Sequence, residues 1–281
     1  MGLRTISGDE VHPIGIGTWG MGGDRLSDGE VCADYRNDDR EIDAIRCAVG
    51  LGQNHIDTAQ LYGAGHTEEI VGEAISGFDR TRLFIATKVW RSHSLRHAVP
   101  RAAEESLRKM RLDVIDLLYV HAPWDAIPME EYIAGLNDAI DAGLTRAIAV
   151  SNFTADQLGR AIALSRHPLA ANQVHYNLLH HGAVDSAMRR RCAENDVTIV
   201  AYRPVERRLL ADRASSSLIL DAAAQLGCTP AQLAIAWLIS QPGVVTIPKA
   251  SSEAHLQENL AATTVRLSES LRARLDRAAL P

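Results

Sequence analysis

The sequence predicts an α/β fold in which eight parallel strands alternate with helices and close into a (β/α)8 barrel, or TIM barrel. The first observation is that short apolar runs alternate with longer amphipathic segments along most of the 281 residues. The second is that no Pro- or Ser-rich linker, acidic tract or low-complexity block divides the chain. We therefore expect residues 1–281 to form a single barrel domain with an N-terminal β-hairpin and extra helices.

A doubly wound open sheet is the alternative fold. It would place a Gly-rich dinucleotide fingerprint between the first strand and a following helix. Here Gly15-Ile16-Gly17 lies inside the first predicted strand, and Thr18-Trp19 follows it without the required spacing or a helix. The barrel is therefore preferred.

The first half of the chain begins with a turn signature, Ser7-Gly8-Asp9, which predicts a small hairpin of Leu3–Thr5 and Val11–Pro13. The segment Gly20–Asn37 is polar, Gly-rich and unpatterned, so it is predicted to be a long surface loop beside a site. Thr67, followed by acidic residues, is predicted to cap a helix. The predicted strands are Ile14–Thr18, His55–Ala59, Leu83–Val89 and Val114–Val120, and the predicted helices are Asp39–Leu51, Thr67–Ser76 and Ser94–Met110.

The second half continues the same alternation. Thr154 is predicted to cap one helix, and Pro230 is predicted in the first turn of another. The predicted strands are Thr145–Val150, Ala171–Val174, Val197–Tyr202 and Val244–Ile247, and the predicted helices are Glu130–Ala142, Thr154–Ser165, Val184–Asn195, Leu218–Leu226, Pro230–Ser240, Ser252–Ala261 and about Ser268–Ala278.

Composition narrows the classes of partner. The net charge is −6 and there is no basic cluster, so we expect neither nucleic acid nor membrane as a partner. The four cysteines lack a paired metal-type spacing, which predicts reduced thiols. No apolar leader or membrane-length window is visible, and we expect a cytoplasmic protein that is a monomer or a weak oligomer.

Four polar residues lie at the carboxyl ends of neighbouring predicted strands: Asp57, Tyr62, Lys88 and His121. In a parallel barrel this edge is where side chains from several strands converge, so we expect them to form one site. Asp57 would hold Lys88 charged, and the ammonium would lower the pKa of Tyr62 and make it a better proton donor. His121 would bind or polarise a carbonyl oxygen. Each residue also has a purely structural alternative as a turn acceptor, solvent-reaching lysine, core tyrosine or strand-end histidine.

Longer motifs containing these residues resemble the aldo-keto reductase family over essentially the whole chain. HIDTAQLYGAGHTEEIVGEAI resembles the segment of the family's second strand, ATKVW its lysine strand and DLLYVHAP its histidine strand. GLTRAIAVSNF, NQVHYNLL, AYRP and TIPKAS continue the match in order. The resemblance implies an NAD(P)H-dependent reduction of aldehydes or ketones, with Tyr62 as general acid, Asp57 and Lys88 tuning it, and His121 orienting the substrate.

The resemblance also implies a cofactor site without a Rossmann domain. It implies that Ser151, Asn152 and Gln173 hold the nicotinamide carboxamide and that Tyr202 stacks on the ring. Without the resemblance, a Ser-Asn pair after a strand is better explained as a helix cap, and a Tyr at a strand end as a packing residue. The full predicted cofactor set is Gly17, Thr18, Trp19, Ser151, Asn152, Gln173, Tyr202, Arg203, Lys249, Ser251, His255, Glu258 and Asn259.

The segment after the eighth predicted strand matches only partly the pattern of family members that prefer NADPH. Lys249 is present, but Ala250 stands at the expected Ser position and His255 at the expected Arg position, while Glu258 and Asn259 match. A neutral His cannot form the bidentate contact that an Arg offers to a phosphate. We expect a modest preference for NADPH, with measurable use of NADH.

Three tryptophans, Trp19, Trp90 and Trp124, follow predicted strand ends on the same rim, which predicts the wall of an apolar substrate pocket. Core packing is the alternative. The loops Gly20–Asn37, His121–Met129 and Arg203–Ser217 would select the substrate, and their conformations do not follow from the sequence.

Two other functions share some of these residues. His55, Asp57, His121, His175 and His180 suggest a metal-dependent hydrolase barrel, but no later strand end completes a ligand shell, so no metal is expected. A redox-sensing or partner-binding barrel that binds the cofactor without significant turnover shares every motif, and only a turnover assay distinguishes it.

Overall fold

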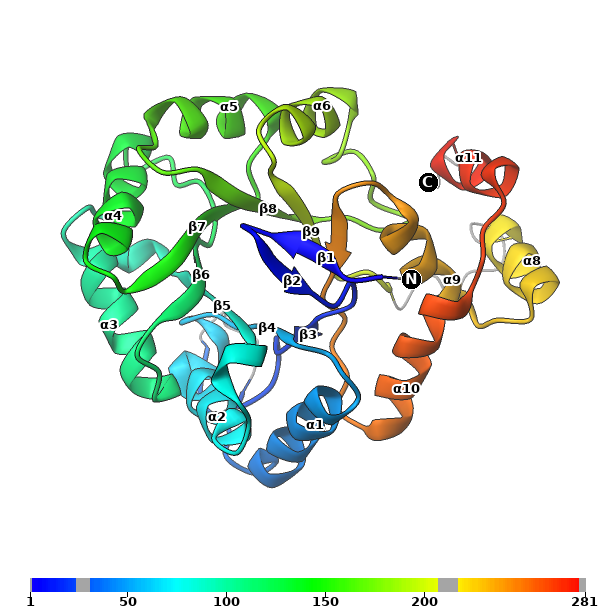
Figure 1. The fold of residues 1–281 in the computed structure, drawn as a ribbon, viewed down its shortest axis with the longest axis horizontal. Helices are drawn as coiled ribbons and strands as arrows, with labels where there is room; N and C mark the ends of the chain where they lie inside the picture. Colours follow the sequence, from blue (N-terminus) through cyan, green and yellow to red (C-terminus); the bar gives the residue numbers. More distant parts are fainter. Residues whose placement is uncertain (1, 24–30, 207–216, 278–281) are drawn as a thin grey trace.

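Eight parallel strands form the centre of the molecule (Figure 1). The computed structural model describes residues 2–23, 31–206 and 217–277. The strands pair in chain order around the sheet, because each is connected to the next by a segment that returns along the outside. They are β3 (Ile16–Gly17), β4 (His55–Asp57), β5 (Phe84–Val89), β6 (Ile115–Val120), β7 (Thr145–Ser151), β8 (Leu169–His175), β9 (Thr198–Tyr202) and β10 (Val244–Thr246).

The first and last strands of this sheet meet and close the barrel. Ile14 forms a parallel bridge with Thr246, and the backbone N–H of Gly15 donates to the Thr246 carbonyl at 2.7 Å. The N–H of Gly17 donates to the Pro248 carbonyl at 3.2 Å. A Cβ atom at position 17 would lie 2.4 Å from the Ile247 carbonyl oxygen, so this seam requires glycine. The predicted (β/α)8 fold is confirmed.

Helices surround the barrel (Figure 1). Their apolar faces pack on the outer surface of the strands, which explains why the strands are almost continuously apolar. They are α1 (Asp38–Gly50), α2 (His66–Ile75), α3 (Ala98–Met110), α4 (Met129–Asp141), α5 (Ala155–Leu164), α6 (Ser186–Glu194), α8 (Ser217–Leu226), α9 (Pro230–Ser240), α10 (Glu253–Ala261) and α11 (Glu269–Arg277), with short 3-10 turns η1 (Tyr62–Gly65), η2 (Arg80–Arg82), η3 (Arg91–His93) and η4 (Ala262–Thr264).

The predicted N-terminal hairpin forms and covers one end of the barrel. Its strands β1 (Arg4–Ile6) and β2 (Asp9–Val11) lie over the middle of the ring in Figure 1. Ile6 and Val11 are fully buried and pack with apolar residues from the amino-terminal halves of the barrel strands, such as Phe84. The hairpin therefore seals this end and leaves the carboxyl ends of the strands as the open face.

Two predicted helix starts are wrong. The helix predicted from Ser94 begins at Ala98, because a start at Ser94 would place Pro100 in the helix interior, where its ring clashes with the preceding turn. Thr67 does not cap α2. The helix begins at His66 after Gly65, which has φ 94°, and the Thr67 hydroxyl donates to the Met21 carbonyl at 2.5 Å.

Several predictions fall partly outside the described residues. These are the loops Gly20–Asn37 and Arg203–Ser217 and the end of the last helix at Ala278. None of the four cysteines, which all lie in the described part of the chain, forms a disulfide. No single helix in the described part of the chain is long and apolar enough to cross a membrane, and only the pair α8 and α9, bent by 90°, passes that test together.

Candidate active site

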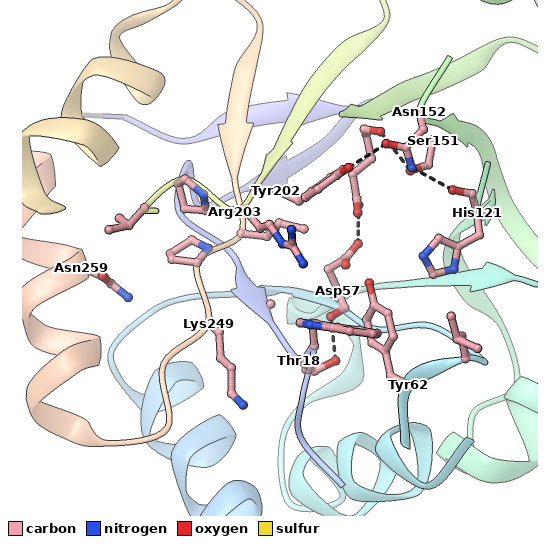
Figure 2. Close-up of a pocket in the computed structure, with 18 of the residues that line it drawn as sticks. Thr18, Asp57, Tyr62, His121, Ser151, Asn152, Tyr202, Arg203, Lys249 and Asn259 are labelled. Atoms are coloured by element: carbon pink, nitrogen blue, oxygen red, sulfur yellow. Dashed lines mark hydrogen bonds between the residues drawn. The ribbon is translucent and has the colours of Figure 1, made fainter. Parts of the chain in front are cut away.

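A cavity of about 820 Å³ opens at the carboxyl ends of the barrel strands (Figure 2). Lys88 lies beneath its floor and is fully buried. Ser251 is not among the lining residues, and its carbonyl accepts a 3.2 Å hydrogen bond from Nε of Arg40. The other predicted site residues line the cavity: Gly17, Thr18, Trp19, Asp57, Tyr62, Trp90, His121, Trp124, Ser151, Asn152, Gln173, Tyr202, Arg203, Lys249, His255, Glu258 and Asn259.

A buried ion pair lies at the base of the cavity. Nζ of Lys88, on β5, is 2.5 Å from Oδ1 of Asp57, at the end of β4. The ammonium also donates to the Thr58 carbonyl at 2.8 Å and to the hydroxyl of Tyr62 at 3.3 Å. All three of its protons are therefore directed at named oxygen atoms, as a buried ammonium requires. Asp57, Lys88 and Tyr62 form one connected group, as predicted.

The second carboxylate oxygen of Asp57 has its own partner. Nε2 of Gln173, on β8, donates to Oδ2 at 2.7 Å. This bond holds the Asp57 carboxylate, and the contact of Gln173 with the carboxamide of nicotinamide, which the resemblance implied, stays a prediction.

A strained turn positions Tyr62. Tyr62 begins η1, in which Gly63 and Ala64 both adopt left-handed backbone conformations. A Cβ atom on Gly63 would lie 2.4 Å from the Gly22 carbonyl oxygen, so the loop can pass this close only with glycine there. The Tyr62 ring packs edge-on against Trp19, with centroids 4.9 Å apart. The phenol is 8% exposed and has little freedom to leave this orientation.

The pKa of Tyr62 is shifted in the opposite direction to the sequence prediction. Burial raises the pKa of Tyr62 above the ordinary value for a phenol, and Lys88 lowers the pKa by less than burial raises it. Lys88 lowers the pKa of Tyr62 as expected, but the opposite effect of burial is larger. The hydroxyl therefore remains protonated at neutral pH, and this is the form that can donate a proton.

His121 follows β6 and faces Tyr62, with ring centroids 5.8 Å apart. Burial, assisted by the charge of Lys88, lowers the pKa of His121 to about 3, so the imidazole is neutral. Its buried Nδ1 has no hydrogen-bond partner among the described residues. A neutral imidazole has one donor and one acceptor nitrogen, so it can orient an oxygen atom without adding charge to the site.

A hydrogen-bond chain connects the ends of β7 and β9. Asn152 adopts a left-handed conformation with φ 63°, which Asn tolerates better than most residues, and this turns the chain into α5. Its Nδ2 donates to Oγ of Ser151 at 3.1 Å and to the His121 carbonyl at 3.1 Å. The hydroxyl of Tyr202 donates to Oδ1 of Asn152 at 2.9 Å. Ser151, Asn152 and Tyr202 therefore form one preorganised wall of the cavity (Figure 2).

Two tryptophans form the opposite wall. Trp90 and Trp124 pack edge-on with centroids 5.1 Å apart, and Trp90 packs edge-on against His121 at 5.1 Å. The indole Nε1 of Trp124 is buried and has no hydrogen-bond partner among residues 2–23, 31–206 and 217–277. The rings therefore give this part of the cavity an apolar wall.

Lys249 and Asn259 lie at the other end of the cavity, far from His121 in Figure 2. Nζ of Lys249 donates to the Gly20 carbonyl at 2.7 Å. Glu258 accepts a 2.9 Å hydrogen bond from the hydroxyl of Thr229. The cavity is thus elongated, with an aromatic end and a cationic end.

Sequence reasoning missed the smaller apolar residues of the lining. Most of them lie within two residues of a predicted site residue, and that position is the signal that could have indicated them, whereas Ala231 lies in α9 and carried no such signal. The set comprises Leu61, Ala122, Pro204, Val205, Ala231, Ile247 and Pro248.

Comparisons with known proteins agree with this geometry. The model of the aldo/keto reductase family matches residues 13–279. An Escherichia coli protein named methylglyoxal reductase YeaE is 33% identical, over 97% of this chain and 93% of its own length. The crystal structure of a thermostable aldo-keto reductase, Tm1743, with the inhibitor epalrestat has a TM-score of 0.92 and 38% identity, covering 99% of this chain and 100% of that chain.

A second solved structure contains a cofactor. An aldo/keto reductase from Klebsiella pneumoniae, crystallised with NADP and acetate, has a TM-score of 0.86 and 33% identity, covering 100% of this chain and 95% of that chain. The match of the family model over almost the whole chain, together with the buried Asp57–Lys88 pair beside Tyr62, leads to one conclusion. The chain belongs to the aldo/keto reductase family.

Proposed function

We propose that the protein reduces aldehydes or ketones to alcohols with a nicotinamide cofactor, and that Tyr62 supplies the proton. The observation that carries this proposal is the placement of the Tyr62 hydroxyl 3.3 Å from the buried ammonium of Lys88. Lys88 is in turn held by Asp57, so the charge beside the phenol is fixed in place.

The donor set of the cavity fits a nicotinamide dinucleotide. Ser151 and Asn152 offer amide and hydroxyl groups near the catalytic end, and Tyr202 offers a flat ring held by its bond to Asn152. Lys249 offers a cation at the far end. When bound, the reduced cofactor supplies a hydride to the carbonyl carbon.

The residues of the chain would then complete the reduction. His121 would orient the carbonyl oxygen toward the Tyr62 hydroxyl. Tyr62 would release its proton to that oxygen as negative charge develops there. Lys88 would stabilise the phenolate that remains, because an ammonium in a buried site interacts strongly with a new negative charge. Trp19, Trp90 and Trp124 would exclude water from the reacting atoms.

NADPH is the proposed cofactor, with a modest preference over NADH. Lys249 is the residue in this set that can pair with the phosphate on the adenosine ribose, whereas Ala250 offers no side-chain donor and is 3% exposed. One charge-assisted contact contributes about 1.5–3 kcal/mol, or roughly ten- to a hundredfold in affinity.

The metal-dependent hydrolase alternative has less support. Both oxygens of the Asp57 carboxylate are engaged, Oδ1 by Lys88 and Oδ2 by Gln173. A metal ion at Asp57 would have to replace the ammonium that lies 2.5 Å away.

The test is a spectrophotometric screen for consumption of NADPH and NADH against varied aldehydes and ketones. Methylglyoxal belongs in the first panel because of the name of the Escherichia coli relative. Carbonyl-dependent oxidation of NADPH would support the proposal. Tight NADPH binding without turnover of any carbonyl in a broad panel would instead favour the redox-sensing or partner-binding alternative.

A further inference from the structure

A second group of functional side chains lies behind Tyr202, outside the cavity. His175 ends β8, His180 lies in the turn after it, and Glu206 follows β9. One donor atom from each residue lies within 4.8 Å of the others. None of the three lines the cavity described above.

We propose that His175, His180 and Glu206 bind one first-row transition metal ion, with Zn²⁺ as the best fit. Nε2 of His175 is 2.9 Å from Oε1 of Glu206, and Nδ1 of His180 is 3.9 Å from the same oxygen. Ligands at about 2.1 Å from a tetrahedral ion lie about 3.4 Å from one another. The first distance is about 0.5 Å shorter than this spacing and the second about 0.5 Å longer, so rotations of the partly exposed His180 and Glu206 side chains would bring both distances to it.

The turn that carries His180 is built to keep this side chain over His175. Oδ1 of the buried Asn177 accepts from the backbone N–H groups of Leu179 and His180, at 2.8 and 3.0 Å. Nδ2 of Asn177 donates to the Arg203 carbonyl at 2.7 Å. The two imidazole rings stack with centroids 4.2 Å apart, so the histidines are already adjacent, and His180 must rotate out of the stack for both rings to direct a lone pair at one ion.

The chemistry of the donors selects the class of ion. Two imidazoles and one carboxylate suit Zn²⁺, Co²⁺, Ni²⁺ or Cu²⁺, whereas Mg²⁺ and Ca²⁺ prefer sets made only of oxygen. A neutral imidazole offers the lone pair that such an ion binds. A set of three protein ligands leaves a fourth position for water.

The sequence led us to expect no bound metal, and the proposed site departs from that expectation. That expectation rested on the absence of a carboxylate at the later strand ends. Glu206 lies four residues beyond the last residue of β9, Tyr202, and only the folded chain brings it to the histidines. The alternative is a simple hydrogen bond between His175 and Glu206 that binds no metal.

The test uses the untagged full-length protein, Zn²⁺ competition with a chromophoric chelator, and Co²⁺ absorption spectra. We expect one equivalent of Zn²⁺ to bind, and His180→Ala and Glu206→Gln to weaken binding at least about tenfold. The matched control is His181→Ala, because the neighbouring ring of His181 contacts the Leu178 carbonyl at 2.6 Å and packs near Trp237. It should bind Zn²⁺ like the wild type.

Thermal unfolding provides a second measurement that does not depend on activity. An ion that binds only the folded protein stabilises it by about 2.7 kcal/mol at a concentration 100 times its Kd. Zn²⁺ should therefore raise the melting temperature of the wild type and His181→Ala, but not that of His180→Ala. Absence of stoichiometric binding by the wild type, or equal binding by His180→Ala and His181→Ala, would overturn the proposal.

Discussion

Nε2 of Gln173 donates a 2.7 Å hydrogen bond to Oδ2 of Asp57, which joins β8 to β4 across the floor of the cavity. Asp57 therefore receives one partner on each oxygen, Lys88 on Oδ1 and Gln173 on Oδ2. The carboxylate cannot rotate without breaking one of these contacts. Gln173 thus acts on Tyr62 indirectly, through Asp57 and Lys88.

We predict that Gln173→Leu destabilises the cofactor-free protein by about 1.5–3 kcal/mol, because it removes a buried hydrogen bond to a charged group. Urea unfolding measures this loss. In an Asp57→Asn background, the same substitution should lower the free energy of unfolding by less than half as much, because the carboxylate charge has been removed. Equal losses in both backgrounds would show that the bond to Asp57 does not contribute.

Replacement of Tyr62 by Phe should reduce kcat for carbonyl reduction at least about 100-fold, because it removes the proton donor and little shape. The dissociation constant for NADPH, measured by fluorescence quenching, should change less than about twofold. Tyr35→Phe, at a side chain that is 65% exposed, is the control and should retain full activity. Activity of Tyr62→Phe above about a tenth of the wild type would contradict the assignment.

Lys88→Met leaves the Asp57 carboxylate buried beside an apolar side chain. We expect a loss of about 3–5 kcal/mol in the free energy of unfolding. The double variant Asp57→Asn/Lys88→Met should recover much of that loss, since no uncompensated charge remains. Arg160→Met is the matched control: its guanidinium pairs with Glu130 at 2.5 Å, both side chains are at least half exposed, and such pairs contribute less than about 1 kcal/mol. A similar loss in both single variants would argue against the buried ion pair.

Acid should destabilise the protein partly through His55, which is fully buried in the barrel with neither ring nitrogen hydrogen-bonded to a described residue. Burial lowers the pKa of His55 from 6.5 to about 4. Between these values the unfolded chain binds a proton that the folded chain does not, so stability is present above pH 6.5 and falls as the pH decreases toward 4. His55→Phe should remove about 2 kcal/mol of the loss between pH 7 and pH 5.

Urea unfolding at several pH values measures this effect. The exposed His93, replaced by Phe, is the control and should leave the pH dependence of the parent unchanged. If His55→Phe has the same pH dependence as the wild type, the buried imidazole is not the cause of the acid sensitivity.

Lys249→Ala should weaken NADPH binding about ten- to a hundredfold and NADH binding much less, because the proposed partner of Lys249 is the ribose phosphate that NADH lacks. Isothermal titration of both cofactors with both proteins measures the difference. Equal losses for NADPH and NADH would show that Lys249 does not recognise the phosphate.

The sequence predicted the order of strands and helices well, because most barrel strands are apolar runs and most helices carry clear end signals, such as Thr154 and Pro230. It predicted the contact of Asp57 with Lys88 because both stand at strand ends that a parallel barrel must bring together. It did not predict the net pKa direction of Tyr62, since burial depends on Trp19 and other residues distant along the chain.

Two further contacts were not predicted for the same reason. The role of Gln173 beside Asp57 depends on a bond across the barrel, and the grouping of Glu206 with His175 depends on where the chain turns after β9. The spacing of neighbouring residues in the sequence indicates neither of these contacts. Local patterns indicate elements, whereas contacts between distant elements decide protonation, orientation and ligand grouping.

The seam between β3 and β10 has a consequence for synthesis on the ribosome. The residues near Ile14 and Gly17 are made more than 200 residues before their partners, from Thr246 to Pro248. Until those partners emerge, the nascent sheet has two unpaired edges, and such edges are sites at which chains aggregate. The barrel, and with it the site, can therefore close only after Pro248 has been made.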